Sequence, residues 1–196
     1  MLSIEPVTLT GEQVRLEPLA IAHADQLFEA GNFEQIWTYM SIEISRPEDV
    51  HSFIAAAMEG QKAGTDLPFA IIDRRTDKAI GSTRLLNISR KDRHVEIGFT
   101  WITPAYWKTA VNTECKWLLL RHCFEQLGCV RVQIKTDARN LNSQRAIERL
   151  GAVREGLLRN ERIVRNGYVR DAVYYSIIDR EWPEVKQRLQ AYLQRA

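Results

Sequence analysis

The stretch VEIGFTWITPAYWKTAVNTECKWLLLRH, residues 95–122, decides the fold. It predicts a strand over 94–102, then a polar turn, then a helix over 113–127 that is apolar on most sides. The next run, CVRVQIKTD at 129–137, alternates apolar and polar residues and predicts another strand. A strand, a helix and a strand in this order indicate a parallel crossover unit.

The segments on both sides of this unit predict further strands and helices, with apolar residues recurring at every second position or at helical spacing. The mixed order of elements predicts a twisted α+β sheet. The expected elements are a strand at 14–19, helical segments at 22–40 broken near Gly31, a helix from Pro47 to Gly60 or Gly64, strands at 68–74 and 79–89, a short helix closed by Gly151, two strands joined at Asn166–Gly167, and a C-terminal helix at about 182–195.

The composition is that of an ordinary globular protein. The 196 residues are 45% hydrophobic and 27% charged, with a net charge of +2, which is too mild to indicate nucleic acid. Neither a signal peptide nor an apolar run of about 18 residues is visible, so we expect a cytoplasmic protein that does not bind membranes. The three cysteines fit no metal pattern, and we expect no metal. One domain over residues 1–196 accounts for the whole chain.

The turn before the central helix resembles a phosphate-binding turn without glycine. The first N–H groups of a helix have no intrahelical partner, and the helix dipole adds positive potential there, so an anion is favoured. Lys108, Thr109, Asn112 and Thr113 add donors. The local sequence leaves two readings open, because an ordinary helix with Asn112 or Thr113 as its N-cap has the same pattern.

Three blocks together resemble the GNAT acyltransferase superfamily, in particular its Rim-type alanine N-acetyltransferases. They are VEIGFTWITPAYWKTAVNTE at 95–114, DARNLNSQRAIERLGAVREG at 137–156 and RDAVYYSIIDREW at 170–182. The resemblance covers nearly all of the chain. It implies the GNAT fold, a mostly antiparallel twisted sheet of about six to seven strands flanked by helices on both faces. It also implies acetyl-CoA as cofactor and acetyl transfer to a primary amine.

In this family the first block carries a pyrophosphate loop of pattern Q/R-x-x-G-x-G/A. Here Trp107 takes the Gln/Arg place, Ala110 the first glycine place and Asn112 the last. Asn112 is the larger departure, although asparagine tolerates unusual backbone angles. The resemblance implies coenzyme A contacts from Phe99, Thr100, Trp101, Ile102, Trp107, Lys108, Thr109, Ala110, Val111, Asn112, Thr113, Asn140 and Ser143.

Acetyl transfer needs a base for the amine, a donor for the oxyanion and help for the leaving sulfur. The resemblance makes Glu96 the base candidate and the backbone N–H groups around Phe99 to Trp101 the oxyanion donors. A solvated carboxylate, or one paired with an arginine such as Arg84, is the alternative for Glu96. The tyrosine that many members use for the sulfur is replaced by Ile147.

Two hydroxyl groups are therefore the candidates to assist the sulfur. Ser143, in the Asn-x-x-Ser motif, is one; its alternative role is a helix N-terminal serine beside a capping Asn142. Tyr175 is the other, with a half-buried strand aromatic as its alternative.

The sequence does not name the acceptor. Trp37 and Tyr39 resemble an aromatic wall over the acceptor site, with a core role as the alternative. A protein N-terminus and a small-molecule amine are both open, as are a monomer and a homodimer. A non-catalytic acyl-CoA-binding module remains an alternative to the enzyme. A nucleic-acid-binding domain is a further alternative. It would use five arginines that are otherwise expected to form a solvated strand face: Arg154, Arg159, Arg162, Arg165 and Arg170.

Overall fold

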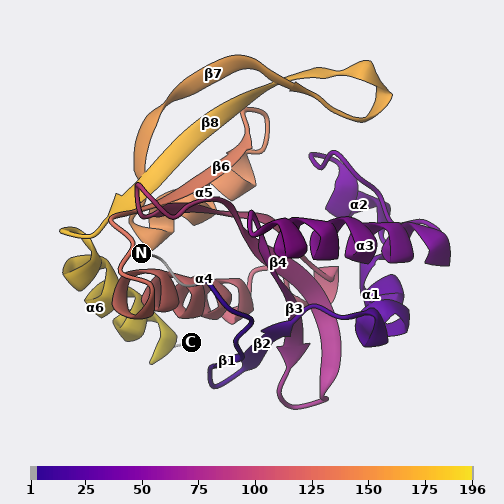
Figure 1. The fold of residues 1–196 in the computed structure, drawn as a ribbon, viewed down its shortest axis with the longest axis horizontal. Helices are drawn as coiled ribbons and strands as arrows, with labels where there is room; N and C mark the ends of the chain where they lie inside the picture. Colours follow the sequence, from indigo (N-terminus) through magenta and orange to yellow (C-terminus); the bar gives the residue numbers. More distant parts are fainter. Residues whose placement is uncertain (1–3, 196) are drawn as a thin grey trace.

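A computed structural model describes residues 4–195. One eight-stranded sheet runs through the molecule in the order β1-β2-β3-β4-β5-β6-β8-β7, and every neighbouring pair is antiparallel except β5–β6 (Figure 1). The strands are β1 Leu9–Thr10, β2 Val14–Pro18, β3 Leu67–Asp73, β4 Lys78–Ser89, β5 His94–Ile102, β6 Arg131–Asp137, β7 Val153–Ile163 and β8 Val169–Ile178. The helices are α1 Ala24–Gly31, α2 Glu34–Trp37, α3 Pro47–Ala63, α4 Val111–Arg121, α5 Leu141–Leu150 and α6 Trp182–Leu193, with short turns at η1 Ile21–His23, η2 Pro104–Tyr106, η3 His122–Gln126 and η4 Arg165–Gly167.

The architecture confirms the expected α+β fold and the parallel crossover, with one strand more than the six to seven expected. The additional strand is β1, which pairs Leu9 with Leu16. Two residues are too few to show an alternating pattern, so β1 carried no signal.

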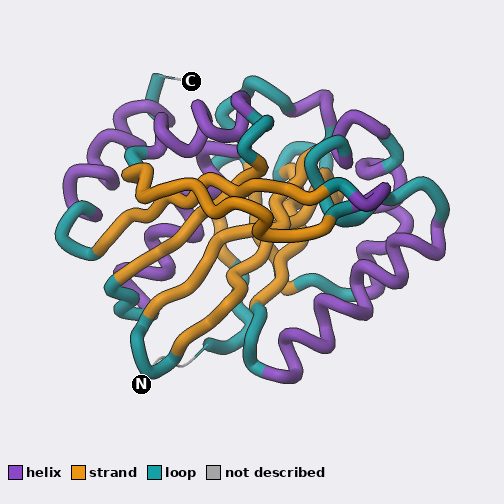
Figure 2. The backbone as a smooth tube through the Cα atoms, turned by 90° about the horizontal axis from the view of Figure 1, so that it is seen from above, coloured by secondary structure: helices purple, strands orange, loops and turns teal. Residues whose placement is uncertain are grey.

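Helices cover both faces of the sheet, as Figure 2 shows from above. On one face α4, α5 and α6 share an apolar cluster with Val95 and Ile97 of β5. On the other face α1, α2 and α3 pack with Trp101 of the same strand. Strand β3 is buried along its whole length because its alternate residues enter the two clusters.

Three helix ends differ from expectation or decide between alternatives. Helix α3 ends at Gly64, whose φ of +73° suits glycine, and not at Gly60. Helix α4 begins at Val111 after Ala110 and continues into a π-helical turn, so neither Asn112 nor Thr113 is its N-cap. Asn140, and not Asn142, caps α5 by accepting a hydrogen bond from the Ser143 backbone.

The two parallel strands separate half-way along their length. The β5–β6 pairing runs from His94–Arg131 to Ile97–Ile134 and stops there, although β5 continues to Ile102 and β6 to Asp137. Phe99 has a φ of +47°, a left-handed conformation that bends β5 beyond the last pair. The result is an opening in the middle of the sheet.

Helix α4 is fixed to the N-terminal strands by Glu114. Its carboxylate is buried and accepts hydrogen bonds from the backbone N–H groups of Glu12, Gln13 and Val14 at 2.6, 2.9 and 2.8 Å. A Cβ on Gly11 would lie 2.5 Å from this carboxyl carbon, so the turn requires glycine there. Among residues 4–195, no helix has the length and apolar character needed to cross a bilayer.

Replacing Glu114 with glutamine should destabilise the protein. The NH2 group of the glutamine side chain cannot accept hydrogen bonds from the backbone N–H groups that the Glu114 carboxylate binds. Each lost charged hydrogen bond contributes roughly 1.5–3 kcal/mol, so we expect a loss of about 2–4 kcal/mol in the free energy of unfolding. Chemical denaturation measures it. The matched control is E184Q, which changes an exposed glutamate in the first turn of α6; equal stability of the two variants would contradict the structural role of Glu114.

Candidate active site

The turn before α4 presents a set of free backbone donors. Within the described part of the chain, no hydrogen bond is donated by the backbone N–H groups of Lys108, Thr109, Ala110, Asn112 and Thr113. The Val111 N–H reaches only the Thr109 hydroxyl, at 3.3 Å. These donors lie at the N-terminus of an 11-residue helix, where the helix dipole favours an anion.

The backbone angles explain how this turn forms without glycine. Ala110 has a φ of −71° and Asn112 lies inside α4, so neither family glycine position needs a positive φ here. The residue in the left-handed region is Lys108, with a φ of +63°. The unusual backbone angle expected at Asn112 is therefore found four residues earlier in the chain.

Two side chains next to the turn contribute to it in different ways: one stabilises its conformation and the other adds positive charge. Trp107 donates its indole N–H to the Ile102 carbonyl at 2.7 Å and its backbone N–H to Pro104, so both its donors hold the turn together. Arg149 of α5 places its guanidinium 3.5 Å from the Thr113 hydroxyl, which adds positive charge beside the free N–H groups. Arg149 was not predicted from the sequence, because its position depends on how α5 lies against α4.

The opening between β5 and β6 lies beside this turn in the chain. Phe99, Thr100, Trp101 and Ile102 follow the last paired residue, Ile97, and their edge toward β6 is unpaired. Trp101 is buried in the core of the α1–α3 face, so only its backbone faces the opening. An extended ligand with amide groups can complete the interrupted hydrogen-bonding edge.

Glu96 lies at the closed end of the opening and is buried, with 2% of its surface exposed. Its carboxylate accepts hydrogen bonds from Asn87 at 2.9 Å and Gln133 at 2.8 Å, and Lys135 lies 3.5 Å away. Asn87 reaches it from a left-handed bulge in β4. The solvated-face alternative for Glu96 is therefore excluded by the geometry.

Lys135 links Glu96 to a second buried ion pair. Its ammonium lies 3.0 Å from Glu161, which Arg170 also contacts at 2.6 Å. Burial lowers the pKa of Lys135, but the attraction of Glu96 and Glu161 outweighs it, and the net shift is upward. Burial raises the pKa of Glu161, but hydrogen bonds from Arg170 and Lys135 outweigh that effect and lower it. Both shifts favour the charged forms of Lys135 and Glu161.

Arg84 is not the partner of Glu96. It lies between the rings of Phe53 and Phe99, 4.7 Å from each centroid, and its nearest carboxylate is Asp66 at 3.6 Å. Burial lowers the pKa of Arg84. The arginine therefore forms part of an aromatic wall next to the bulge at Phe99.

The structure places the other candidate catalytic residues at α5 and β8. Ser143 donates its backbone N–H to Asn140, which fixes the first turn of α5 and occupies the side-chain oxygen of Asn140. Tyr175 is fully buried and donates its hydroxyl to Glu148 at 3.0 Å. Burial and the hydrogen bond to Glu148 raise the pKa of Tyr175. Ile147 lies in the apolar cluster shared with α4.

The two aromatic residues expected at the acceptor site have different positions. Trp37 is 1% exposed and packs on Trp101 at 5.2 Å between ring centroids, so it belongs to the core. Tyr39 is half-buried, and its ring lies 5.6 Å from the guanidinium of Arg139, which also stacks on Tyr168 at 3.6 Å. Arg139 therefore connects the segment after α2 with the β7–β8 hairpin.

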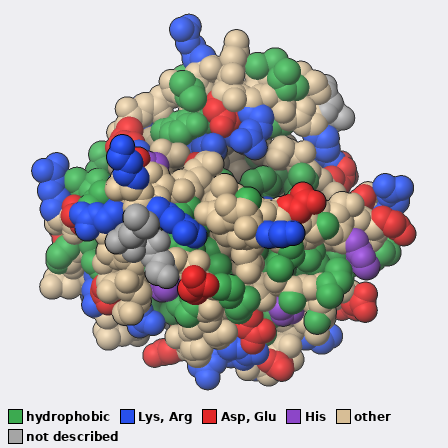
Figure 3. Space-filling model, in the orientation of Figure 1, with side chains coloured by type: hydrophobic (Ala, Val, Ile, Leu, Met, Phe, Trp, Pro, Cys, Tyr) green, Lys and Arg blue, Asp and Glu red, His purple; other side chains and the backbone are tan. Residues whose placement is uncertain are grey.

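The tip of the β7–β8 hairpin reaches toward the segment after α2, where Arg165 pairs with Glu43, and the surface is hollowed beneath it (Figures 1 and 3). Arg170 pairs with Glu161, whereas Arg154, Arg159 and Arg162 are exposed. The arginine series is thus divided between ion pairs and a solvated strand.

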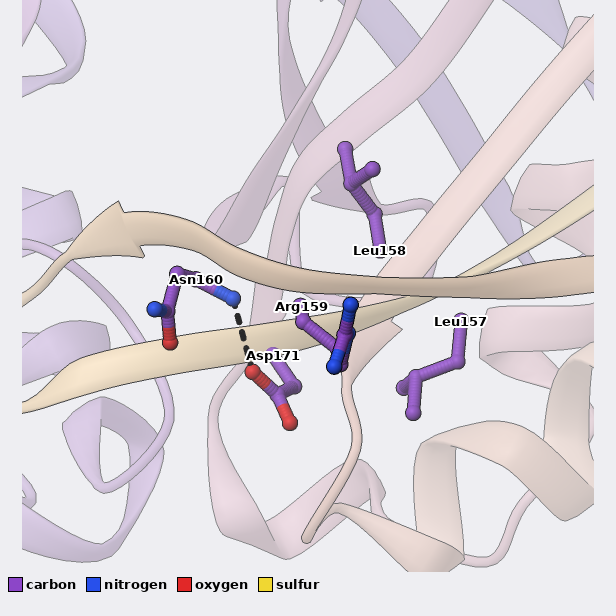
Figure 4. A pocket seen from close by; sticks show the side chains of 5 residues that line it. All are labelled: Leu157, Leu158, Arg159, Asn160 and Asp171. Atoms are coloured by element: carbon purple, nitrogen blue, oxygen red, sulfur yellow. Dashed lines mark hydrogen bonds between the residues drawn. The ribbon is translucent and has the colours of Figure 1, made fainter.

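An open pocket of about 650 Å³ lies on the hairpin itself, lined by Leu157, Leu158, Arg159, Asn160 and Asp171 (Figure 4). Asn160 donates its backbone N–H to Asp171 at 2.8 Å, which shapes the bulge of β7. None of the candidate catalytic residues lines this pocket, so it is separate from the opening at Glu96.

Comparison with known proteins adds to this geometry. Residues 13–153 match the family model described as acetyltransferase (GNAT) domain. The chain is 35% identical over 102 residues to the "Putative ribosomal N-acetyltransferase YdaF" of Bacillus subtilis (strain 168), covering 52% of this chain and 55% of the relative. A crystal structure of a GCN5-related N-acetyltransferase from Brucella melitensis superposes with a TM-score of 0.90 at 32% identity, covering 97% of this chain and 86% of that one. Mycobacterium smegmatis RimJ in complex with CoA-disulfide has the same fold, with a TM-score of 0.83 at 20% identity and 95% of each chain covered.

An aspartate at position 112 should separate helix stability from anion binding. A negative charge in the first turn of α4 stabilises the helix by about 0.3–1 kcal/mol, but it repels a diphosphate at the same N-terminus. For N112D we expect coenzyme A affinity to fall at least about tenfold, a change of 1.4 kcal/mol, without a fall in melting temperature. Calorimetric titration and thermal unfolding give the two values. Unchanged affinity in N112D, with N142D as the control on α5, would contradict a pyrophosphate site at this turn.

Proposed function

The chain belongs to the GNAT acetyltransferase family, and on that premise we propose that it transfers an acetyl group from acetyl-CoA to a primary amine by direct attack within a ternary complex. We further propose the α-amino group of a peptide or protein as its acceptor. The observation that carries the proposal is the opening in the sheet between β5 and β6, which has different chemical groups at its two ends. Free backbone donors lie next to it at residues 108–113, and the buried carboxylate of Glu96 lies at its closed end.

The residues of this chain fit coenzyme A. The free N–H groups before α4, with Arg149 beside them, would hold the pyrophosphate, and the unpaired edge from Phe99 to Ile102 would hold the extended arm. Acetyl-CoA, when bound, supplies an activated acetyl thioester. The backbone N–H groups after the bulge at Phe99 would donate to the oxygen on which charge develops.

Glu96 would accept the proton that the amine loses. Two amide groups fix its carboxylate, and Lys135 holds the opposite charge at 3.5 Å, so Glu96 is oriented before the acceptor arrives.

The basicity of the acceptor amine favours an N-terminal acceptor. A lysine side chain with a pKa near 10.4 must spend about 4–5 kcal/mol to be neutral at pH 7, whereas an α-amino group near 7.7–8.0 needs only about 1–1.5. The relative YdaF, named as a putative ribosomal N-acetyltransferase, supports a protein acceptor as well. Tyr39 and the hairpin residues that meet it at Arg139 would border the approach of such a chain end.

The leaving sulfur needs a partner near α5. Ser143 remains a candidate because Asn140 holds it at the first turn of α5. Tyr175 remains one only if its hydroxyl turns away from Glu148.

Replacing Glu96 with glutamine should remove the base and keep the fold. We expect kcat for a peptide with a free N-terminus to fall about 10²-fold or more. The residual rate of E96Q should rise with pH up to about 8, where the α-amino group itself loses its proton. Rates of acetyl-CoA consumption between pH 6 and pH 9 measure both effects.

The control variant is E59Q, which changes an exposed glutamate of α3. A matched peptide with a blocked N-terminus and an internal lysine tests the acceptor. Faster acetylation of the lysine peptide would overturn the N-terminal assignment. Coenzyme A binding without turnover of any amine would overturn the transfer function itself.

A further inference from the structure

Lys116 is a buried charge that the mechanism above does not use. It lies in the second turn of α4, only 5% exposed. Its ammonium donates to the Thr100 hydroxyl at 2.6 Å, and that hydroxyl lies 2.8 Å from the Thr83 hydroxyl. Because an ammonium only donates, Thr100 accepts from Lys116 and can donate to Thr83. The lysine is thereby held against β5.

No opposite charge compensates this ammonium among residues 4–195. None of the salt bridges includes Lys116. Glu114, two residues away, is turned toward the β1–β2 turn. The titratable neighbour on its own helix is Cys115, and burial raises the pKa of that thiol to about 12, so it is neutral. The partners on β5 and β4 are the neutral hydroxyls of Thr100 and Thr83. Burying an unpaired ammonium is costly unless an anion comes to meet it.

The position of Lys116 indicates where such an anion would lie. Thr100 is three residues beyond Ile97, the last residue of β5 paired with β6, so the ammonium contacts the part of β5 that has no partner in β6. It lies on the α4 side of the sheet, the side to which Ile147 also belongs. The side chain in the family's tyrosine position is thus apolar, and the same face of the sheet carries the cation of Lys116.

We propose that Lys116 is a catalytic residue that stabilises the departing thiolate of coenzyme A by forming an ion pair with it in the opening between β5 and β6. The inference rests on the proposed function and assigns the leaving-group role that Ile147 cannot fill. Burial lowers the pKa of Lys116 to about 8, so the ammonium is the main form at pH 7 and its charge is present when the thiolate forms.

The step balances without any further reactant. The acceptor nitrogen forms the C–N bond, the C–S bond breaks, and its electron pair goes to sulfur. The proton of the amine goes to Glu96. Lys116 keeps its protons and faces the sulfur anion until the thiolate leaves and takes a proton from water.

The test uses the full chain with coenzyme A alone, without turnover. Ultraviolet absorbance of the thiolate, followed against pH, gives the pKa of the bound thiol. In the wild type we expect it at least about one unit below the free value of about 8.5. In K116M, which replaces the cation by an apolar chain of similar length, we expect it at or above the free value. The control K62M changes an exposed lysine of α3 and should behave as the wild type.

Desulfo-coenzyme A separates this role from general binding. At pH 8 a one-unit shift of the thiol pKa changes the affinity for coenzyme A about threefold. We therefore expect K116M to lose at least about threefold of its affinity for coenzyme A and none of its affinity for the desulfo analogue. Equal losses for both would overturn the proposal, because the lysine would then serve the arm or the fold. A thiol pKa that K116M leaves low, and that S143A raises, would also overturn it in favour of Ser143.

The wild-type measurement keeps the proposal falsifiable even if K116M does not fold. A bound thiol at or above the free value in the wild type overturns the role of Lys116 while acetyl transfer stands. Failure of the wild type to bind coenzyme A, or to acetylate any amine, overturns the proposed function instead. The two failures are therefore distinguishable.

Discussion

The interrupted pairing of β5 and β6 is the constraint on which the rest of the structure depends. Two parallel strands normally continue side by side, but here the ladder stops at Ile97 and Ile134 because Phe99 takes a left-handed conformation. The unpaired backbone groups beyond that point would be costly if the strands closed over them without a partner. The opening and its free edge both follow from this one bend. The unpaired backbone edge alone can therefore bind an extended ligand that carries amide groups.

The two faces of the sheet differ in whether their buried charges have partners of opposite sign. On the face of the sheet away from α4, Glu96, Lys135, Glu161 and Arg170 alternate in sign, so each buried charge has a partner. On the α4 side Lys116 has a hydroxyl group as its described partner. Paired charges hold their positions with little change in protonation, whereas an uncompensated charge responds strongly to a ligand. The two faces thus differ in how they can take part in a reaction.

Much of the fold could be predicted from the sequence, because its signals are local. Alternation in 95–102 and 129–137 and the apolar helix between them define the crossover, and Gly64 and Gly151 end their helices at left-handed positions. The acetyltransferase family and the position of Glu96 on β5 were also accessible. The partners of Glu96 were not, since Asn87, Gln133 and Lys135 meet it through strand register and a non-glycine bulge. Trp37 and Asn142 show the same limit, because burial and capping are decided by packing that a linear pattern does not encode.

The hydrogen bonds of Glu114 have a consequence for the order in which the protein folds. They join residues 100 to 102 positions apart, between the first strands and the helix that follows β5. Contacts this distant in sequence carry a large loop-closure cost and form after the local helices and hairpins. During synthesis the three N–H groups of the N-terminal turn are hydrogen-bonded to water until α4 has emerged and Glu114 can replace that water. The helix that presents the free donors at residues 108–113 is therefore anchored at a late step of folding.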